Sequence, residues 1–114
     1  MVHKNQVISG IIAFMENHII PSAKDNQKII LRTIQAGMAV APEKVWDLIK
    51  KNEILAMTGA VEGDEINIEL LSRILSNGLG NDEFDLSFRL LGNEYKIYLS
   101  AEDVKALKGY IERA

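Results

Sequence analysis

Residues 84–114 read FDLSFRLLGNEYKIYLSAEDVKALKGYIERA, and this stretch decides more of the fold than any other. Apolar and polar residues alternate from Phe84 to Leu90 and again from Glu94 to Leu99, which is the period of a strand with one buried face. Between the two runs, Gly92-Asn93 suits a two-residue turn that needs positive φ. The pattern therefore predicts a two-stranded antiparallel hairpin.

A turn at Gly92-Asn93 also sets the register of this hairpin. Leu91 then pairs with Glu94, and the inward pairs are Leu90 with Tyr95, Phe88 with Ile97, and Leu86 with Leu99. All six of these side chains fall on one face, as one-sided burial requires. Two strands alone are marginally stable, so we expect the apolar face to pack on helices. One helix begins at once, with Ser100 as its cap and Asp103 at its third position.

Upstream of the hairpin, the apolar spacing predicts helices. Residues 5–20 and 23–40 form two of them, with Pro21 ending the first and Ser22 with Asp25 forming a capping box for the second. Pro42 suits the first turn of a third helix, a short piece covers 53–58, and Asn67 caps a fourth. The residues that we place inward are Val7, Ile8, Ile11, Ile12, Met15 and Ile19, then Ile29, Ile30, Thr33, Ile34 and Gly37, then Val45, Leu48 and Ile49, with Trp46 at the edge.

The predicted fold class is therefore α+β and mainly α. It has four to five helices and a C-terminal two-stranded antiparallel β-hairpin, which is followed by a terminal helix. A length of 114 residues suits one domain spanning 1–114. Within that domain, 1–59 is the helical part, and 60–114 holds the acidic helix, the hairpin and the terminal helix.

The composition excludes several classes of protein. Without cysteine there is no disulfide, no thiolate nucleophile and no cysteine-ligated zinc. No apolar run reaches the roughly 18–20 residues of a membrane span, so we expect a soluble, cytoplasmic protein without membrane contact. Residues 61–114 hold eleven Asp/Glu against six Lys/Arg. That acidic half argues against a nucleic-acid footprint over the whole molecule.

The chain shows no catalytic, cofactor-binding or metal-binding motif. Glycine and acidic residues at 62–69 resemble part of a calcium-binding loop. Thr58 and Ala60 would then occupy two of the ligand positions of that loop, so both ligands are lost and we expect no specific calcium site. His3 and His18 have no second histidine or Glu-x-x-His pairing to build a metal site. We therefore expect a non-enzymatic protein without cofactors. The alternative enzyme would use His18 as its base, with acidic neighbours such as Glu16.

Two features indicate binding partners. Lys24, Lys28 and Arg32 recur every four residues and form a basic row, which suits nucleic-acid backbone or an acidic protein, or is an ordinary solvated helix face. Apolar residues also lie off the main stripes, as Phe14, Leu31 and Met38 do. A domain this small buries several apolar faces per helix only with difficulty. We therefore expect a homo-oligomer, a symmetric dimer, or a protein partner, against the alternative of a well-covered monomer.

Several segments together resemble a group of known proteins. They are 18–21 (HIIP), 52–57 (NEILAM) before a glycine-containing acidic turn, 66–71 (INIELL), and 103–107 (DVKAL) after the hairpin. In their order they are similar to small uncharacterised proteins encoded in phages and prophages of Gram-positive bacteria. The resemblance implies a phage-related setting and no activity that is carried by particular residues.

The leading hypothesis from the sequence is a protein-interaction or assembly module in a phage or prophage setting. The alternative is a small nucleic-acid-binding or regulatory module that uses Lys24, Lys28 and Arg32.

Overall fold

The computed structural model describes the backbone of residues 1–76, 83–90 and 93–114. Within these ranges it describes every side chain except those of residues 54, 75–76, 83–90, 93–98 and 101. The elements in chain order are β1 (Val2–His3), α1 (Lys4–Phe14), a π-helical turn (Met15–Ile19), a 3₁₀ turn (Ile20–Ser22), α2 (Asp25–Val40), α3 (Pro42–Lys50), α4 (Glu53–Thr58), β2 (Val61–Glu62), β3 (Glu65–Ile66), α5 (Ile68–Ser76), β4 (Glu83–Leu90), β5 (Asn93–Ser100) and α6 (Ala101–Arg113).

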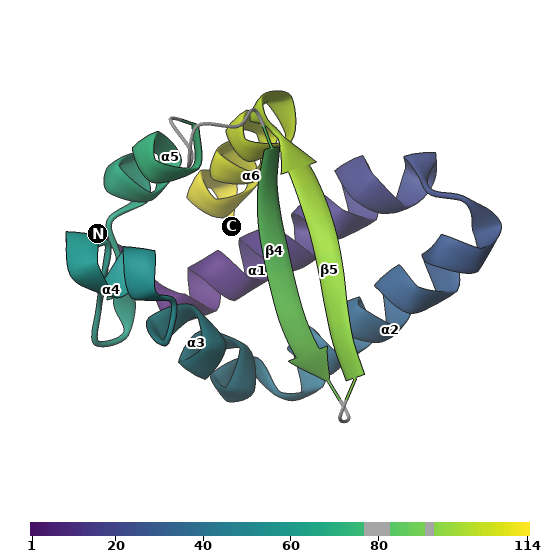
Figure 1. The fold of residues 1–114 in the computed structure, drawn as a ribbon, viewed down its shortest axis with the longest axis horizontal. Coiled ribbons are helices and arrows are strands. Elements are labelled where there is room, and N and C mark those ends of the chain that lie inside the picture. The colour runs from purple at the N-terminus through teal and green to yellow at the C-terminus, as the bar shows by residue number, and fades with distance from the viewer. Residues whose placement is uncertain (77–82, 91–92) are drawn as a thin grey trace.

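The described residues are mainly helical, with six α-helices and a small three-stranded sheet (Figure 1). The prediction of a mainly α protein is therefore confirmed. The three-stranded sheet was not predicted. In it β3 lies between β1 and β2, and Ile66 is opposite both Val2 and Val61. This sheet ties the first residues of the chain to residues 61–66.

The strands β4 and β5 pair in antiparallel fashion, with Phe84 opposite Leu99 and Phe88 opposite Tyr95. The predicted register, with Phe88 opposite Ile97, is wrong by two residues, and Asn93 begins β5 instead of forming the turn. Because side chains alternate with a period of two, this shift leaves every residue on its predicted side of the ribbon. Residues 91–92 and the side chains of 75–98 lie outside the described part, so the turn and the burial of one face stay predictions.

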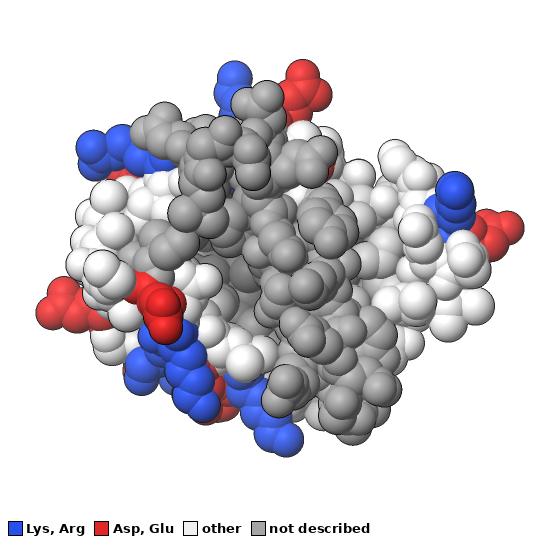
Figure 2. All heavy atoms as spheres, in the orientation of Figure 1, with Lys and Arg blue, Asp and Glu red and all other residues white. Residues whose placement is uncertain are grey.

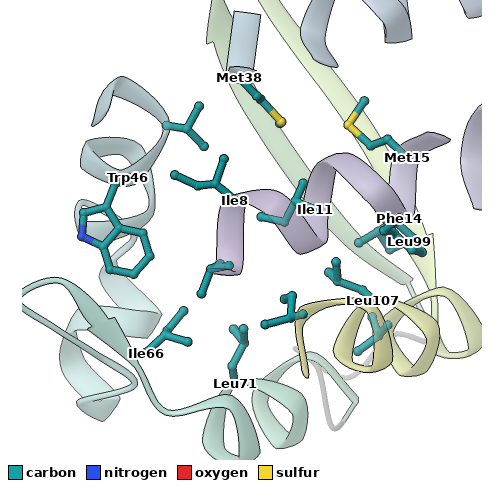
Figure 3. Close-up of a cluster of buried hydrophobic side chains, with 14 of the residues drawn as sticks. Ile8, Ile11, Phe14, Met15, Met38, Trp46, Ile66, Leu71, Leu99 and Leu107 are labelled. Atoms are coloured by element: carbon teal, nitrogen blue, oxygen red, sulfur yellow. The ribbon is translucent and has the colours of Figure 1, made fainter. Parts of the chain in front are cut away.

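The helix α1 is the centre of the packing. It contacts α6 most extensively and also packs against α2 and α3 (Figure 1). Phe14, which was predicted to lie off the apolar stripe of this helix, is buried. The buried cluster that forms around α1 draws on both the 1–59 and the 60–114 parts of the chain (Figure 3).

Two positions in α3 differ from the prediction. Trp46, placed at the edge by sequence, is only 1% exposed, and its indole Nε1–H donates to the carbonyl oxygen of Gly63 at 2.9 Å. Leu48, placed inward, is 37% exposed. The indole therefore satisfies its one polar group against the β2–β3 turn while its ring fills the core.

The contact between α1 and α6 depends on a glycine. A Cβ atom built on Gly10 would lie 2.5 Å from the Cα of Ile111 and 2.8 Å from its backbone nitrogen. Ordinary contacts between carbon atoms are about 3.5–4.0 Å, so only a residue without a side chain allows the two helices to approach this closely. Ile111 is fully buried at this crossing.

The capping signals differ in their outcome. Ser100 and Asp103 form the predicted capping box, and the side-chain oxygen of Asn67 accepts the N–H of Leu70 at 3.1 Å, as a cap does. The capping box of Ser22 with Asp25 is wrong, because Lys24 is the N-cap residue of α2 and makes no side-chain capping bond. The first helix is also not regular to Ile20, since π-helical and 3₁₀ turns replace its last predicted turns.

Candidate protein-interaction surface

The helix α2 turns one narrow stripe toward the core. Leu31, Ile34 and Met38 are buried in the cluster that surrounds α1. The sequence pattern predicted Leu31 and Met38 off the main apolar stripe, and it predicted Ile29, Ile30 and Thr33 inward. Ile34 is buried as predicted and Gly37 is half-buried, but Ile29, Ile30 and Thr33 are exposed. The inward face of α2 was therefore predicted correctly at Ile34 and wrongly at Ile29, Ile30 and Thr33.

The side of α2 away from the core carries a second apolar stripe. Each residue advances about 100° around a helix, so Ile29, Thr33, Ala36 and Val40 lie within about 60° of one another. All four are exposed, with Ile29 at 71% and Val40 at 85%. We call these four residues the outer stripe. It lies about 160° from the buried stripe on the same helix.

Polar contacts with α1 and the following π-helical turn hold α2 in this orientation. Gln35 donates from Nε2 to the carbonyl oxygen of Ile12 at 3.1 Å and to Glu16 Oε2 at 3.2 Å. The Nη1 atom of Arg32 donates to the same oxygen of Glu16 at 3.2 Å. These bonds fix the rotation of α2 about its own axis, so the outer stripe faces away from the molecule.

The only polar side chain of the outer stripe has its hydroxyl group satisfied. Thr33 Oγ1 donates to the carbonyl oxygen of Ile29 at 2.8 Å, one helical turn back. This bond holds the hydroxyl against the backbone of its own helix. A partner that covers Thr33 therefore meets a hydroxyl whose hydrogen is already bonded within the helix.

The three members of the predicted basic row differ in their surroundings, and of the three only Arg32 borders the outer stripe. Arg32 is ion-paired with Glu16, Lys28 is half-buried, and Lys24 is exposed. Neither lysine has an ion pair with a described residue. The described charged side chains in the view of Figure 2 lie mostly around the rim of the molecule. Within the described part of the chain, the row thus contributes two unpaired positive charges and not three.

His18 lies in the π-helical turn and joins it to the start of α6. Its Nε2 atom is 2.9 Å from Asp103 Oδ1, and its ring stacks on Phe14 with centroids 5.1 Å apart. Glu16, the acidic neighbour that the enzyme alternative assigned to His18, bonds Arg32 and Gln35 instead. His18 and Asp103 thus connect two helices that are distant in sequence.

The carboxyl group of Asp103 has a pKa below its ordinary value of 3.8. Partial burial raises this pKa, but the hydrogen bonds from the Ser100 N–H and from His18 together outweigh the burial and favour the ionised form. The same carboxylate therefore caps α6 and receives the bond from His18.

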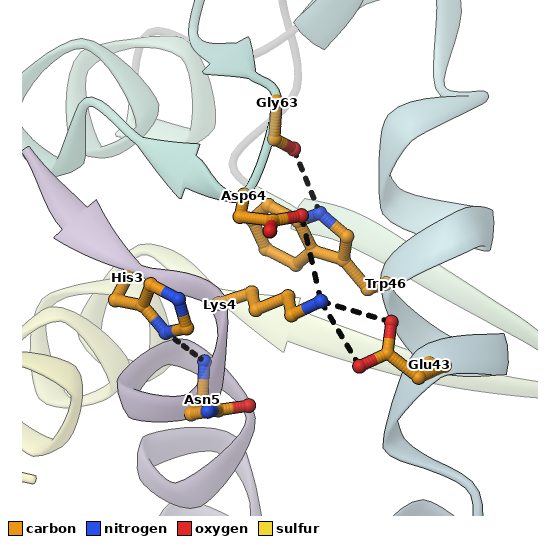
Figure 4. A network of polar contacts seen from close by, with 7 residues as sticks. All are labelled: His3, Lys4, Asn5, Glu43, Trp46, Gly63 and Asp64. Carbon is orange, nitrogen blue, oxygen red and sulfur yellow. Dashed lines mark hydrogen bonds and ion pairs between the residues drawn. The ribbon is translucent and has the colours of Figure 1, made fainter.

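The acidic turn that resembles part of a calcium-binding loop connects β2 to β3. Its Asp64 carboxylate forms an ion pair with Lys4 Nζ at 3.4 Å, and the same ammonium group is 2.9 Å from Glu43 (Figure 4). The hydrogen bond to Glu43 raises the pKa of Lys4. Among the described residues, no group of three or more His, Asp and Glu side chains is placed to hold a metal ion. His3 caps α1 by accepting the N–H of Asn5 at Nδ1.

Two further findings concern membrane-spanning helices and similarity to known proteins. No helix in the described part of the chain is long and apolar enough to cross a membrane. No protein-family model matches the chain, and neither a curated protein nor a solved structure shows significant similarity to it.

The outer stripe was missed because α2 carries apolar residues on two opposite sides. Periodicity shows that both stripes exist and does not show which of them meets α1. One signal was present in the sequence. Gln35 adjoins the buried stripe and Arg32 adjoins the outer stripe on the same side of the helix, and Glu16 on the preceding helical segment was available to pair with them.

Proposed function

We propose that the chain is a non-enzymatic protein-interaction or assembly module that binds its partner through the outer stripe of α2. The observation that carries this proposal is the exposure of Ile29 and Val40 directly opposite the buried stripe of the same helix. Single exposed apolar residues are common, but an aligned set along one helix face is typical of an interaction site. The partner is a second copy of the chain or another protein.

The expected affinity is modest. Burying an Ile or Val side chain contributes about 1.5–3 kcal/mol. Two mostly exposed residues on each side of an interface therefore contribute about 5–9 kcal/mol in total. Association costs at least about 4 kcal/mol in lost freedom, so at most about 5 kcal/mol remains and we expect a dissociation constant of about 0.2 mM or higher.

The C-terminal hairpin belongs to the same proposal. We infer that residues 84–99 form the predicted two-stranded hairpin, supported by the backbone pairing of β4 with β5. In Figure 1 these strands lie across α1 and reach the C-terminal end of α2. Ile29 and Val40 are exposed with the strands in this position, so the hairpin leaves the outer stripe open. The phage or prophage setting rests on the sequence resemblance.

The test is the solution mass by light scattering across a dilution series, for the wild type and two variants. Val40→Lys places a charge on the outer stripe, and it suits the C-terminal end of a helix, so the fold is expected to persist. Met57→Lys is the matched control, because Met57 is 86% exposed and lies on α4, away from the stripe. We expect association of the wild type and of Met57→Lys, and at least a tenfold weaker association of Val40→Lys, which corresponds to about 1.4 kcal/mol. Equal effects of the two substitutions, or a monomer at every concentration, would contradict the proposal.

The alternative function is a nucleic-acid-binding or regulatory module. It is supported by Lys24 and Lys28, neither of which has an ion pair with a described residue. It predicts binding to a short DNA or RNA duplex that weakens steeply with salt. Replacing Lys24, Lys28 and Arg32 by Ala would weaken that binding. Affinity that does not change with salt, or no binding at low salt, would exclude this alternative.

A further inference from the structure

We draw no further inference here: the strongest candidate, the outer stripe of α2 as a contact between two copies of the chain, belongs to the surface already described, and nothing in the structure shows what covers it.

Discussion

The close contact between α1 and α6 predicts that Gly10→Ala destabilises the protein, although alanine is the better helix former. An added Cβ atom would lie 2.5 Å from the Cα of Ile111 and 2.8 Å from its backbone nitrogen. These are backbone atoms of a fully buried residue, so no side-chain rotation can relieve the overlap. The two helices must therefore separate by about 1 Å to restore an ordinary contact of about 3.5 Å.

The expected magnitude is a difference between two opposing effects. Overpacking a core costs about 1–3 kcal/mol, and a contact with backbone atoms belongs at the upper end of that range. Replacing Gly by Ala within a helix stabilises it by about 1 kcal/mol. We therefore expect Gly10→Ala to lower the free energy of unfolding by about 2 kcal/mol.

The matched control is Gly109→Ala on the opposing helix. There the added Cβ atom would have its nearest neighbour at 3.6 Å, on the flexible side chain of Arg113. Only the gain in helix propensity remains, so we expect Gly109→Ala to be more stable than the wild type by up to about 1 kcal/mol. The two substitutions are chemically identical, so their difference isolates the contact with Ile111.

The assay is equilibrium unfolding in urea, followed by the fluorescence of Trp46. This is the single tryptophan of the chain, and it is buried, so its emission changes when the core opens. Circular dichroism of the helices provides a second probe, and coincident transitions would justify a two-state fit. A Gly10→Ala variant that is as stable as the wild type would refute the close approach of α1 and α6. Equal losses in both variants would refute it as well.

Three further outcomes follow from the site and its surroundings. Because the pKa of Asp103 is lower in the folded protein than its ordinary value of 3.8, its carboxylate stabilises the fold above that pH, and this stabilisation is lost as the pH falls through the folded pKa. We therefore expect Asp103→Asn to lower the free energy of unfolding by about 1 kcal/mol at neutral pH. The difference in unfolding free energy between wild type and variant, measured in urea, should become smaller below pH 3.8. A difference that does not change with pH would contradict this prediction. Gly63 has a φ of 60° with open space around it. We therefore expect Gly63→Ala to lower the free energy of unfolding by about 1 kcal/mol through backbone strain alone, and Gly63→Asn to lower it less. The reverse order of stability in thermal unfolding would contradict this prediction. Glu16→Gln should weaken the bonds that Arg32 and Gln35 donate to this side chain. We expect the free energy of unfolding to fall by no more than about 1 kcal/mol, because exposed ion pairs contribute about 0–1 kcal/mol. A larger loss in urea unfolding would show that these bonds contribute more to the packing of α2 than exposed pairs usually do.

Much of the local structure was predictable because it depends on residues that are close in sequence. Gly59 ends α4 in a left-handed conformation, and Asn67 and Ser100 cap the helices that follow them. Each of these signals acts through hydrogen bonds that span three or four residues. The wrong prediction of a cap at Ser22 shows the limit of such signals, because Ser22 is the last residue of a 3₁₀ turn that contains Pro21.

The candidate site was predictable only in part. The sequence indicated surplus apolar surface in the first helices and a partner to cover it, but it assigned that surplus to Phe14, Leu31 and Met38. All three are buried in the structure, and the large apolar residues that α2 exposes are Ile29, Ile30 and Val40. The sequence predicted one row of Lys24, Lys28 and Arg32, but Lys24 precedes α2 and Arg32 is paired with Glu16 from another helical segment. Helical spacing alone does not show such a pair.

The sequence by itself determined that this protein is mainly helical and where most of its helices begin and end, because capping, proline and glycine act within one or two turns of the chain. Only the tertiary structure decided which side of α2 meets the core. Both of its apolar stripes have helical spacing, and the choice depends on α1 and on the bonds that Gln35 donates to Ile12 and Glu16. The close approach at Gly10 and the sheet of β1, β3 and β2 likewise require residues far apart in sequence to meet, which local periodicity does not encode.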